Sequence, residues 1–336
     1  MPRALITDLS GTTIGAEERR FLREADPLGI IFFARNIENP EQLLELANDF
    51  RSTVGRSDAP VMIDQEGGRV ARLRPPHWWG GVANARIAAL DDDEAELAAW
   101  LAARIMASEM ASCGIDVDCA PVLDLLVPGM HDVIGDRSFG SDPARVADLG
   151  RAACEGFLAG GVLPMVKHMP GHGRVGVDPH ERLPTAEVDR ATLEREDFVP
   201  FQALADAPWG MTAHVIYPAL DPDRPATQSP TVIGDIIRGV IGFNGVLVSD
   251  AIDMEALTGS HEERARLSLE AGCDVVMHCN QPLEVRRRVA DAVPELRGAA
   301  LERVEAAAAR RTTPADDFDR AAALSRLDSL LADTAR

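Results

Sequence analysis

The sequence predicts an α/β protein that folds as a single-domain (β/α)8 barrel, the TIM-barrel fold. Eight short apolar segments recur along its 336 residues, and helix-like segments separate them. Such alternation is typical of βαβ units around a parallel sheet. No GxGxxG motif follows the first apolar segment, which disfavours an open dinucleotide-binding sheet. The expected strands are residues 4–7, 29–34, 60–63, 115–122, 162–166, 210–213, 245–249 and 274–278.

Three of the intervening segments carry clear helix start signals. In each, a side chain that can cap a helix stands directly before a proline, which favours the first helical position. These segments are residues 39–50, 142–161 and 229–243, with Asn39, Asp142 and Ser229 as the caps. No linker or repeat divides the chain, so we expect one domain over residues 1–336. From about residue 282 the chain is rich in Ala, Arg and Glu at helical spacing, and we expect residues 282–336 to form C-terminal helices that pack on the barrel.

Composition excludes several classes of function. The net charge of −20 disfavours binding to nucleic acid or to an anionic membrane, since both need a basic surface. No stretch approaches eighteen apolar residues, and residues 1–13 lack the features of a signal peptide. The five cysteines form no CxxC pair, which favours reduced, buried thiols. We therefore expect a cytoplasmic protein with no membrane or nucleic-acid partner, and a monomer.

Ionisable residues follow all eight expected strands. In a barrel of this kind the active site is built where the strands end, at their C-terminal side. One or two such residues could be polar groups satisfied in loops, but eight occupied ends favour a pocket for a polar ligand. The residues are Asp8, Arg35, Asp64, Asp124, Lys167 with His168, His214, Asp250 and His278.

The stretch KHMPGHGRVGVDPH, residues 167–180, concentrates groups that could serve a metal, an anion or a proton transfer. His168 and His172 have the spacing of a helical zinc pair, but Pro170 and Gly171 between them prevent that helix. Metallohydrolase barrels usually carry an HxH after the first strand, and this chain has TDLSG there. The glycines lack the GK[ST] ending of a phosphate loop. The prediction is no metal and no cofactor.

Proton transfer is the remaining possibility for this stretch. Pro179 favours an extended conformation at Asp178, which places the Asp178 and His180 side chains on the same side. The carboxylate can then bond one imidazole nitrogen and favour imidazolium, leaving the other nitrogen to exchange a proton. The surrounding glycines suit a mobile lid. A surface loop with an incidental Asp–His contact is the alternative.

Asp250 supplies a second reactive group. It ends the stretch GVLVSD, after four apolar or small residues and a serine, at the mouth of the seventh expected strand. A carboxylate in that place can act as a nucleophile or stabilise positive charge. A carboxylate opposite a separate proton donor is the arrangement that glycoside hydrolysis needs, although the usual donor is a second carboxylic acid.

At these residues the sequence resembles the family 3 glycoside hydrolases, specifically the bacterial β-N-acetylglucosaminidases of cell-wall recycling. The matching stretches run in order from residue 29 to about residue 254. DQEGGRV and the KH-x-PGHG loop with its D-x-H are the specific signals. The stretches are GIIFFARNIENPEQL, MIDQEGGRVARL, DRSF, KHMPGHGRVGVDPHERLP, MTAHVIYPALD and GFNGVLVSDAIDM.

The resemblance implies a retaining enzyme that removes non-reducing terminal N-acetylglucosamine through a glycosyl-enzyme intermediate. It implies that Asp250 is the nucleophile and that His180, partnered by Asp178, is the general acid/base. The sugar-binding positions it implies are Asp64, Arg72, Arg137, Lys167 and His168. The implied substrate is a small amino sugar derived from muropeptides, such as GlcNAc-1,6-anhydro-MurNAc with or without its peptide.

Two other functions stay open at this point. The same site could pass the sugar to phosphate instead of water, because a histidine acid/base does not repel an incoming anion as a carboxylate does. Alternatively, the chain could be a non-catalytic sugar-binding barrel, against which the intact Asp250, Asp178 and His180 argue. The natural leaving group could be an anhydro-muramoyl sugar, its peptide-bearing form or a chitin fragment.

Overall fold

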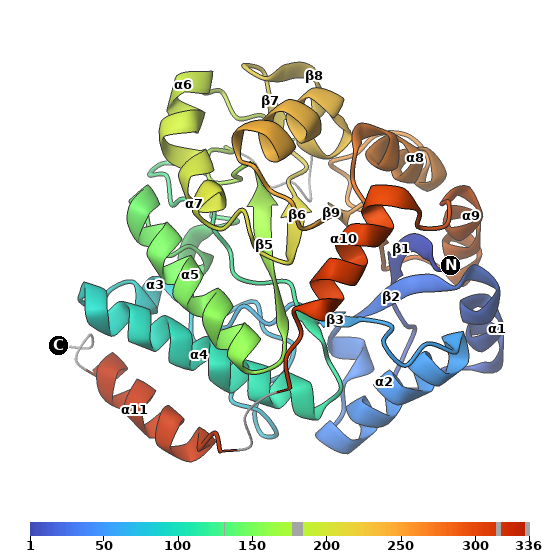
Figure 1. Cartoon of the computed structure of the whole chain (residues 1–336), viewed down its shortest axis with the longest axis horizontal. Coiled ribbons are helices and arrows are strands. Elements are labelled where there is room, and N and C mark those ends of the chain that lie inside the picture. The colour runs from blue at the N-terminus through green and yellow to red at the C-terminus, as the bar shows by residue number, and fades with distance from the viewer. Residues whose placement is uncertain (131, 177–183, 314–316, 333–336) are drawn as a thin grey trace.

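The computed structural model of the chain, which describes residues 1–130, 132–176, 184–313 and 317–332, contains a closed barrel of eight parallel strands (Figure 1). Around the barrel the strand order is β1-β10-β9-β6-β5-β4-β3-β2, and β2 pairs with β1 to close it. The predicted (β/α)8 fold is confirmed, and each expected strand overlaps an observed one. The strands are β1 (Arg3–Thr7), β2 (Pro27–Phe32), β3 (Val61–Ile63), β4 (Val117–Asp118), β5 (Leu163–Met169), β6 (Trp209–Thr212), β9 (Val246–Ala251) and β10 (Val275–His278).

Helices cover the outside of the barrel, so the strands are buried on both faces and read as apolar runs rather than alternating ones. All six residues of β2 are buried, for example. The helices that follow the strands are α1 (Ala16–Ala25), α2 (Pro40–Val54), α4 (Asp92–Ser112), α5 (Pro143–Ala159), α7 (Phe198–Ala203), η5 (Val232–Val240), α8 (His261–Ala271) and α9 (Leu283–Ala292). Short pieces are η1 (Ala34–Asn36), α3 (Asn84–Ile87), η2 (Gly135–Arg137), α6 (Arg190–Thr192), η3 (Leu193–Asp197) and η4 (Ala226–Gln228).

The three predicted helix caps are all present. The Asn39 side chain accepts a hydrogen bond from the backbone of Gln42, and Asp142 accepts from the two residues after Pro143. Ser229 Oγ accepts the Val232 N–H at 3.0 Å. The helix that Ser229 begins then widens into π-helical turns over Val232–Val240, which a proline-and-cap signal does not predict.

A small antiparallel hairpin follows β6, and the sequence did not predict it. It pairs β7 (Ile216–Tyr217) with β8 (Asp221–Pro225) and lies outside the barrel. The residues of β8 are DPDRP, three charged residues and two prolines, and proline is disfavoured within strands because it cannot donate to the ladder. The hairpin is an edge element, where those residues are tolerated.

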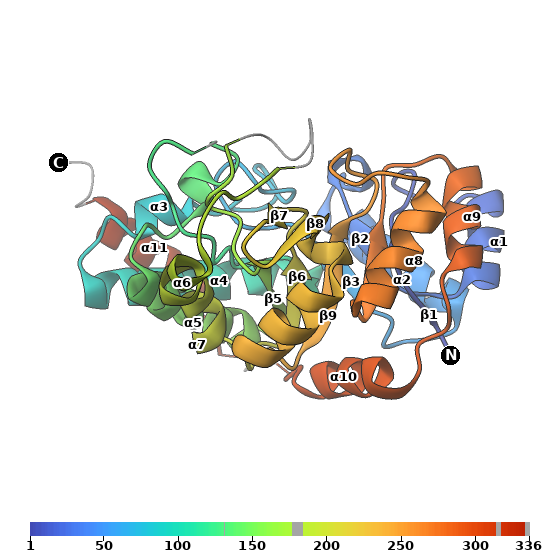
Figure 2. The ribbon, with the colours of Figure 1, turned by 90° about the horizontal axis from the view of Figure 1, so that it is seen from above.

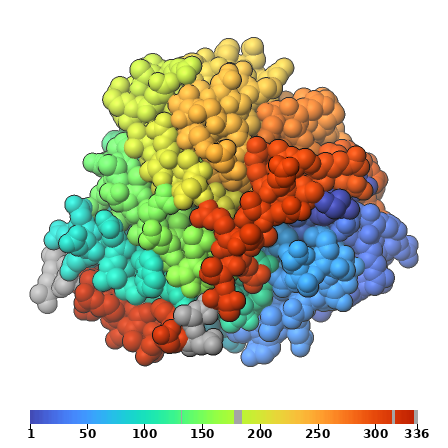
Figure 3. Space-filling view, viewed as in Figure 1, coloured from blue at the N-terminus to red at the C-terminus, as the bar shows by residue number. Residues whose placement is uncertain are grey.

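Two helices complete the C-terminal region after α9. Helix α10 (Gly298–Ala309) lies across the face of the barrel where the strands begin, as Figures 2 and 3 show. There Leu301 and Val304 line a mainly apolar cavity together with Leu163 and Trp209 at the starts of β5 and β6. Helix α11 (Arg320–Ala332) packs along α4 through buried leucines at positions 327, 330 and 331.

The five cysteines are unpaired and buried, as expected from their number and spacing. In the part of the chain that the structure describes, none of the helices has the length and apolar character needed to cross a membrane. The cytoplasmic location and the monomeric state stay predictions.

Candidate active site

A cavity of about 410 Å³ opens at the C-terminal ends of the strands. Six of the eight predicted site residues line it: Asp64, Arg72, Arg137, Lys167, His168 and Asp250. They come from segments up to 186 positions apart (64 to 250) that the closed barrel brings together. The other two, Asp178 and His180, lie outside the described residues.

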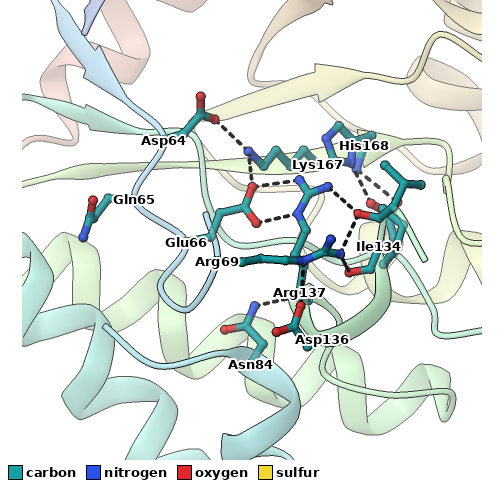
Figure 4. A network of polar contacts seen from close by, with 12 residues as sticks. Asp64, Gln65, Glu66, Arg69, Asn84, Ile134, Asp136, Arg137, Lys167 and His168 are labelled. Carbon is teal, nitrogen blue, oxygen red and sulfur yellow. Dashed lines mark hydrogen bonds and ion pairs between the residues drawn. The ribbon is translucent and has the colours of Figure 1, made fainter. Parts of the chain in front are cut away.

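Lys167 and Arg137 are held by a shared carboxylate, Glu66 (Figure 4). Lys167 Nζ lies 2.6 Å from Glu66 Oε1 and 3.0 Å from Asp64 Oδ1. The Arg137 guanidinium donates to both oxygens of Glu66, at 2.7 and 2.8 Å. Because Lys167 and Glu66 are almost completely buried, neither could keep its charge without such partners.

These contacts fix the protonation states of the cluster. Burial disfavours the Lys167 charge, but the Asp64 and Glu66 carboxylates outweigh it and raise the pKa of Lys167 above its ordinary value. Burial raises the pKa of Glu66, but the positive charges of Lys167 and Arg137 outweigh it. They hold this pKa well below the usual range. Both side chains are therefore charged at neutral pH, and their ion pairs hold them in fixed orientations.

Glu66 was missed as a site residue because it does not follow a strand directly. It lies two residues after Asp64, directly before the tight Gly67–Gly68 turn, and lines the cavity. Gly67 has φ +91°, and a Cβ there would lie 2.4 Å from the Val82 carbonyl oxygen, so only glycine fits the turn. The DQEGG stretch itself was the available signal: an acidic residue before two glycines.

Arg69, just after this turn, fastens the loop that carries Arg137 (Figure 4). Its Nη2 donates to the carbonyls of Asp132, Val133 and Ile134, at 2.7 to 3.0 Å. Its Nε lies 2.7 Å from Asp136 Oδ1. The segment 66–69 thus holds the 132–137 loop through three contacts: Glu66 with Arg137, Arg69 with the backbone carbonyls, and Arg69 with Asp136.

Replacing Glu66 by glutamine is expected to raise KM about tenfold or more, with a smaller fall in kcat. The variant leaves Lys167 with Asp64 alone and Arg137 without its carboxylate, so both cations lose their orientation, at a cost of about 2–5 kcal/mol for breaking a buried pair. Steady-state kinetics would measure the effect. The matched control is Glu45→Gln on exposed α2 surface, which should behave as wild type. An unchanged KM in Glu66→Gln would contradict this role.

His168 is oriented by Asp124. Its Nδ1 lies 2.6 Å from Asp124 Oδ2, while Asp124 Oδ1 accepts the backbone N–H groups of His168 at 3.1 Å and His172 at 2.7 Å. Burial opposes the charge of Asp124, but the two histidines and these bonds hold its pKa below the ordinary value. The carboxylate therefore selects the Nδ1–H form of His168 and leaves Nε2 for a ligand.

His172 does not form a helical pair with His168, as Pro170 and Gly171 predicted. His168 belongs to β5 and His172 to the loop after it, with ring centroids 5.6 Å apart. Burial and the neighbouring His168 lower the pKa of His172 to about 4, so its ring is neutral at neutral pH. Within the described ranges, no three His, Cys, Asp or Glu side chains are grouped so that they could hold a metal ion.

Asp250, near the end of β9, presents its carboxylate to the cavity. Its Oδ1 accepts the Ala251 N–H at 2.7 Å. Burial works against the charge, but the neighbouring His214 and His168 and this hydrogen bond outweigh it, and the pKa of Asp250 lies below its ordinary value. The nearby Asp253 differs: burial raises its pKa, and its oxygens accept from Cys279 and Asn280. The surroundings of Asp250 thus favour its ionised form, whereas burial of Asp253 disfavours the charge of that carboxylate.

Not every strand end faces this cavity, which corrects the expectation of a single pocket lined by all eight. Asp8 and Arg35 pair with each other in a neighbouring recess of about 290 Å³. His278 contacts His261, with 2.8 Å between the ring nitrogens. Asp124 and His214 lie behind the cavity wall and act through other residues.

The fold and the pocket together define a carbohydrate-active barrel enzyme, in which an ionised carboxylate faces fixed cationic hydrogen-bond donors. The chain belongs to glycosyl hydrolase family 3, since residues 5–313 match the description "Glycosyl hydrolase family 3 N terminal domain". The predicted family is thereby confirmed.

Individual relatives agree with this assignment. A beta-hexosaminidase of Alkalilimnicola ehrlichii is 42% identical over 288 residues, which span 83% of this chain and 81% of that protein. A beta-hexosaminidase of Chromobacterium violaceum is 38% identical over 332 residues, 95% of this chain and 90% of that protein. The crystal structure of NagZ from Neisseria gonorrhoeae in complex with N-trifluoroacetyl-D-glucosamine superposes with a TM-score of 0.84 at 33% identity, covering 100% of this chain and 98% of that one. The chain is a glycoside hydrolase of the beta-hexosaminidase type, as predicted.

Proposed function

We propose that the chain is a retaining exo-β-N-acetylglucosaminidase acting on peptidoglycan fragments. Its substrate would be GlcNAc-1,6-anhydro-MurNAc, with or without peptide, from which it removes the non-reducing terminal N-acetylglucosamine. The observation that carries this proposal is the state of Asp250: an ionised carboxylate in the cavity, with one oxygen held by the Ala251 N–H. The names of the relatives and the N-acetylglucosamine analogue bound to one of them support the choice of sugar.

The proposed reaction has two steps. Asp250 attacks the anomeric carbon while imidazolium His180 protonates the departing oxygen, and a glycosyl-aspartate forms. The same histidine, now neutral, then removes a proton from water, which attacks the anomeric carbon and releases Asp250. The roles of His180 and Asp178 rest on the sequence and on the family resemblance.

The sugar would be held by the fixed polar groups of the cavity. Lys167 and Arg137 present oriented cationic donors, and His168 presents Nε2 because Asp124 occupies Nδ1. Arg72 lies 3.4 Å from Asp64, and its Nε is buried without a hydrogen-bond partner among the described residues. Such donors and acceptors suit hydroxyl and acetamido groups, which can both donate and accept.

Two assays test the proposed function. Purified protein should release aryl alcohol from an aryl β-N-acetylglucosaminide, and N-acetylglucosamine from GlcNAc-1,6-anhydro-MurNAc. NMR taken early in the reaction should show the β-anomer of the product first. Initial release of the α-anomer would contradict retention, and no turnover of either substrate would contradict the activity.

The charge of the cavity favours water over phosphate as the acceptor. When the acceptor enters, Asp250 carries the sugar, and the described lining still holds four carboxyl groups, on Asp64, Glu66, Asp253 and Glu255, against three cations, on Arg72, Arg137 and Lys167. A dianion entering such a site meets net repulsion. In phosphate buffer we therefore expect free N-acetylglucosamine rather than its 1-phosphate, which phosphorus NMR of the products would check. Accumulation of the 1-phosphate would establish the phosphorylase.

Chelation is expected to leave turnover unchanged. The proposed steps use only protein side chains, and the sequence lacks both a helical histidine pair and the first-strand HxH of metallohydrolases. The measurement is the rate after dialysis against EDTA, compared with the rate after dialysis against buffer alone. A loss that zinc or manganese restores would overturn the side-chain mechanism.

A further inference from the structure

A chain of buried hydrogen bonds lies behind the proposed nucleophile. Thr212 Oγ1 lies 2.8 Å from Thr227 Oγ1, which lies 2.7 Å from His214 Nδ1. On its other side, His214 Nε2 lies 3.1 Å from the carbonyl oxygen of Ala251, the residue after Asp250. These three side chains are at most 1% exposed, so water does not compete for the bonds.

The chemistry of the partners fixes where each hydrogen lies. A carbonyl oxygen can only accept, so His214 Nε2 must carry a hydrogen and donate it to Ala251. Burial lowers the pKa of His214 below its ordinary value, and the nearby Asp250 offsets only part of this effect. A neutral ring protonated at Nε2 has a lone pair at Nδ1, and the Thr227 hydroxyl, which also lies 3.0 Å from the Ala213 carbonyl oxygen, is the donor placed 2.7 Å from it. Thr212 then donates to Thr227, and the donors of the chain all point toward Ala251.

Ala251 needs this support because the strand ladder is irregular there. Between β9 and β10 the register shifts from Val275 opposite Val248 to Met277 opposite Ala251. The Ala251 carbonyl also accepts the Met254 N–H at 3.1 Å. The Ala251 N–H, in turn, holds Asp250 Oδ1 at 2.7 Å. The residue that orients the carboxylate is thus fixed by a side chain where regular pairing is interrupted.

We propose that His214 is a positioning residue for Asp250. Its Nε2–H, directed by Thr227, holds Ala251 so that the Ala251 N–H aims the carboxylate at the anomeric carbon. This inference rests on the proposed function, in which Asp250 is the nucleophile. His214 does not touch the substrate, so its removal should slow the attack without weakening sugar binding.

The test compares His214→Leu with His214→Gln, using an aryl β-N-acetylglucosaminide. We expect kcat to fall about ten- to a hundredfold in His214→Leu, the usual scale for a small misplacement of a reacting group, with KM changed less than about threefold. His214→Gln should recover most of kcat, because the glutamine amide can donate to Ala251. The Thr227 hydroxyl still has the Ala213 carbonyl oxygen as an acceptor in that variant, 3.0 Å away.

A second pair of variants keeps the test decisive if His214→Leu does not fold. Thr227→Val removes the hydroxyl that directs the ring, whereas Thr227→Ser keeps it. We expect the same loss of kcat at constant KM in the valine variant and near-wild-type kcat in the serine variant. Thermal melting of each protein accompanies the kinetics, so that rates are compared well below every midpoint.

The outcomes separate this inference from the proposed function. If Asp250→Ala is inactive but His214→Leu and Thr227→Val both turn over at the wild-type rate, the positioning role is wrong and the proposed function stands. The role is also wrong if His214→Gln loses as much kcat as His214→Leu, since ring packing rather than the hydrogen bond would then matter. If Asp250→Ala itself stays active, the proposed function is wrong and the inference falls with it.

Discussion

Asp250→Ala is expected to lower kcat by a factor on the order of thousands while the protein stays folded. The substitution removes the carboxylate that would form the glycosyl-enzyme bond. The residue is the second-last of strand β9, and within the described part of the chain its side chain makes one hydrogen bond, from the N–H of its own neighbour Ala251. Little else in the fold depends on it. Steady-state rates with an aryl β-N-acetylglucosaminide and a thermal melt would measure both halves of the prediction.

The matched control is Asp253→Asn, three residues on. Asp253 lines the same cavity, but its oxygens bond Cys279 and Asn280, and burial raises its pKa. We expect this variant to lose less than about tenfold in rate, because the amide oxygen can still accept the Cys279 N–H, and the contact with Asn280 that is lost is the longer one, at 3.4 Å. Azide offers a further check, since a small anion in the space left by Asp250→Ala can attack the anomeric carbon and give the α-glycosyl azide. Retention of more than a few per cent of the wild-type rate in Asp250→Ala would instead favour attack by the substrate's own acetamido group.

The parts of the fold that local sequence controls were predictable. Strands buried on both faces appear as apolar runs. Three helix starts are recognisable by a capping residue directly before a proline, at Asn39, Asp142 and Ser229. Because a parallel barrel places all strand ends on one rim, residues such as Asp64, Lys167 and Asp250 could be expected to meet without knowledge of any contact. The structure brings these three into one cavity.

Contacts between distant segments were not predictable in the same way. Glu66 stands beyond the end of a strand, and its ion pairs with Lys167 and Arg137 join segments that are 101 and 71 positions away along the chain (66 to 167 and 66 to 137). Asp124 was visible as a polar strand end, but its bond to His168 depends on how two strands meet across 44 positions. Such pairs form because the fold brings the two residues close in space. The periodicity of a single sequence predicts helices and strands, but not which distant residues come together.

His180→Ala is expected to affect substrates according to their leaving groups. An alkoxide-like leaving group, such as the anhydro-muramoyl sugar, needs a proton to depart, whereas an aryloxide needs little. We expect kcat/KM to fall at least about a hundredfold for GlcNAc-1,6-anhydro-MurNAc, and far less for an activated aryl β-N-acetylglucosaminide, the scale being that of general acid catalysis. The measurement is kcat/KM of wild type and variant on both substrates.

Asp178→Asn separates the two members of the dyad. Asparagine keeps the size of the side chain but removes the charge that favours imidazolium, and it no longer selects one tautomer of His180. We therefore expect Asp178→Asn to show the same dependence on the leaving group as His180→Ala, with a smaller loss on the natural substrate. The control for both is His77→Ala, an exposed histidine on the loop after β3, which should match wild type on both substrates. If His180→Ala lost equal activity on both substrates, His180 would be a sugar-binding or loop-holding residue, and the proton would come from another group.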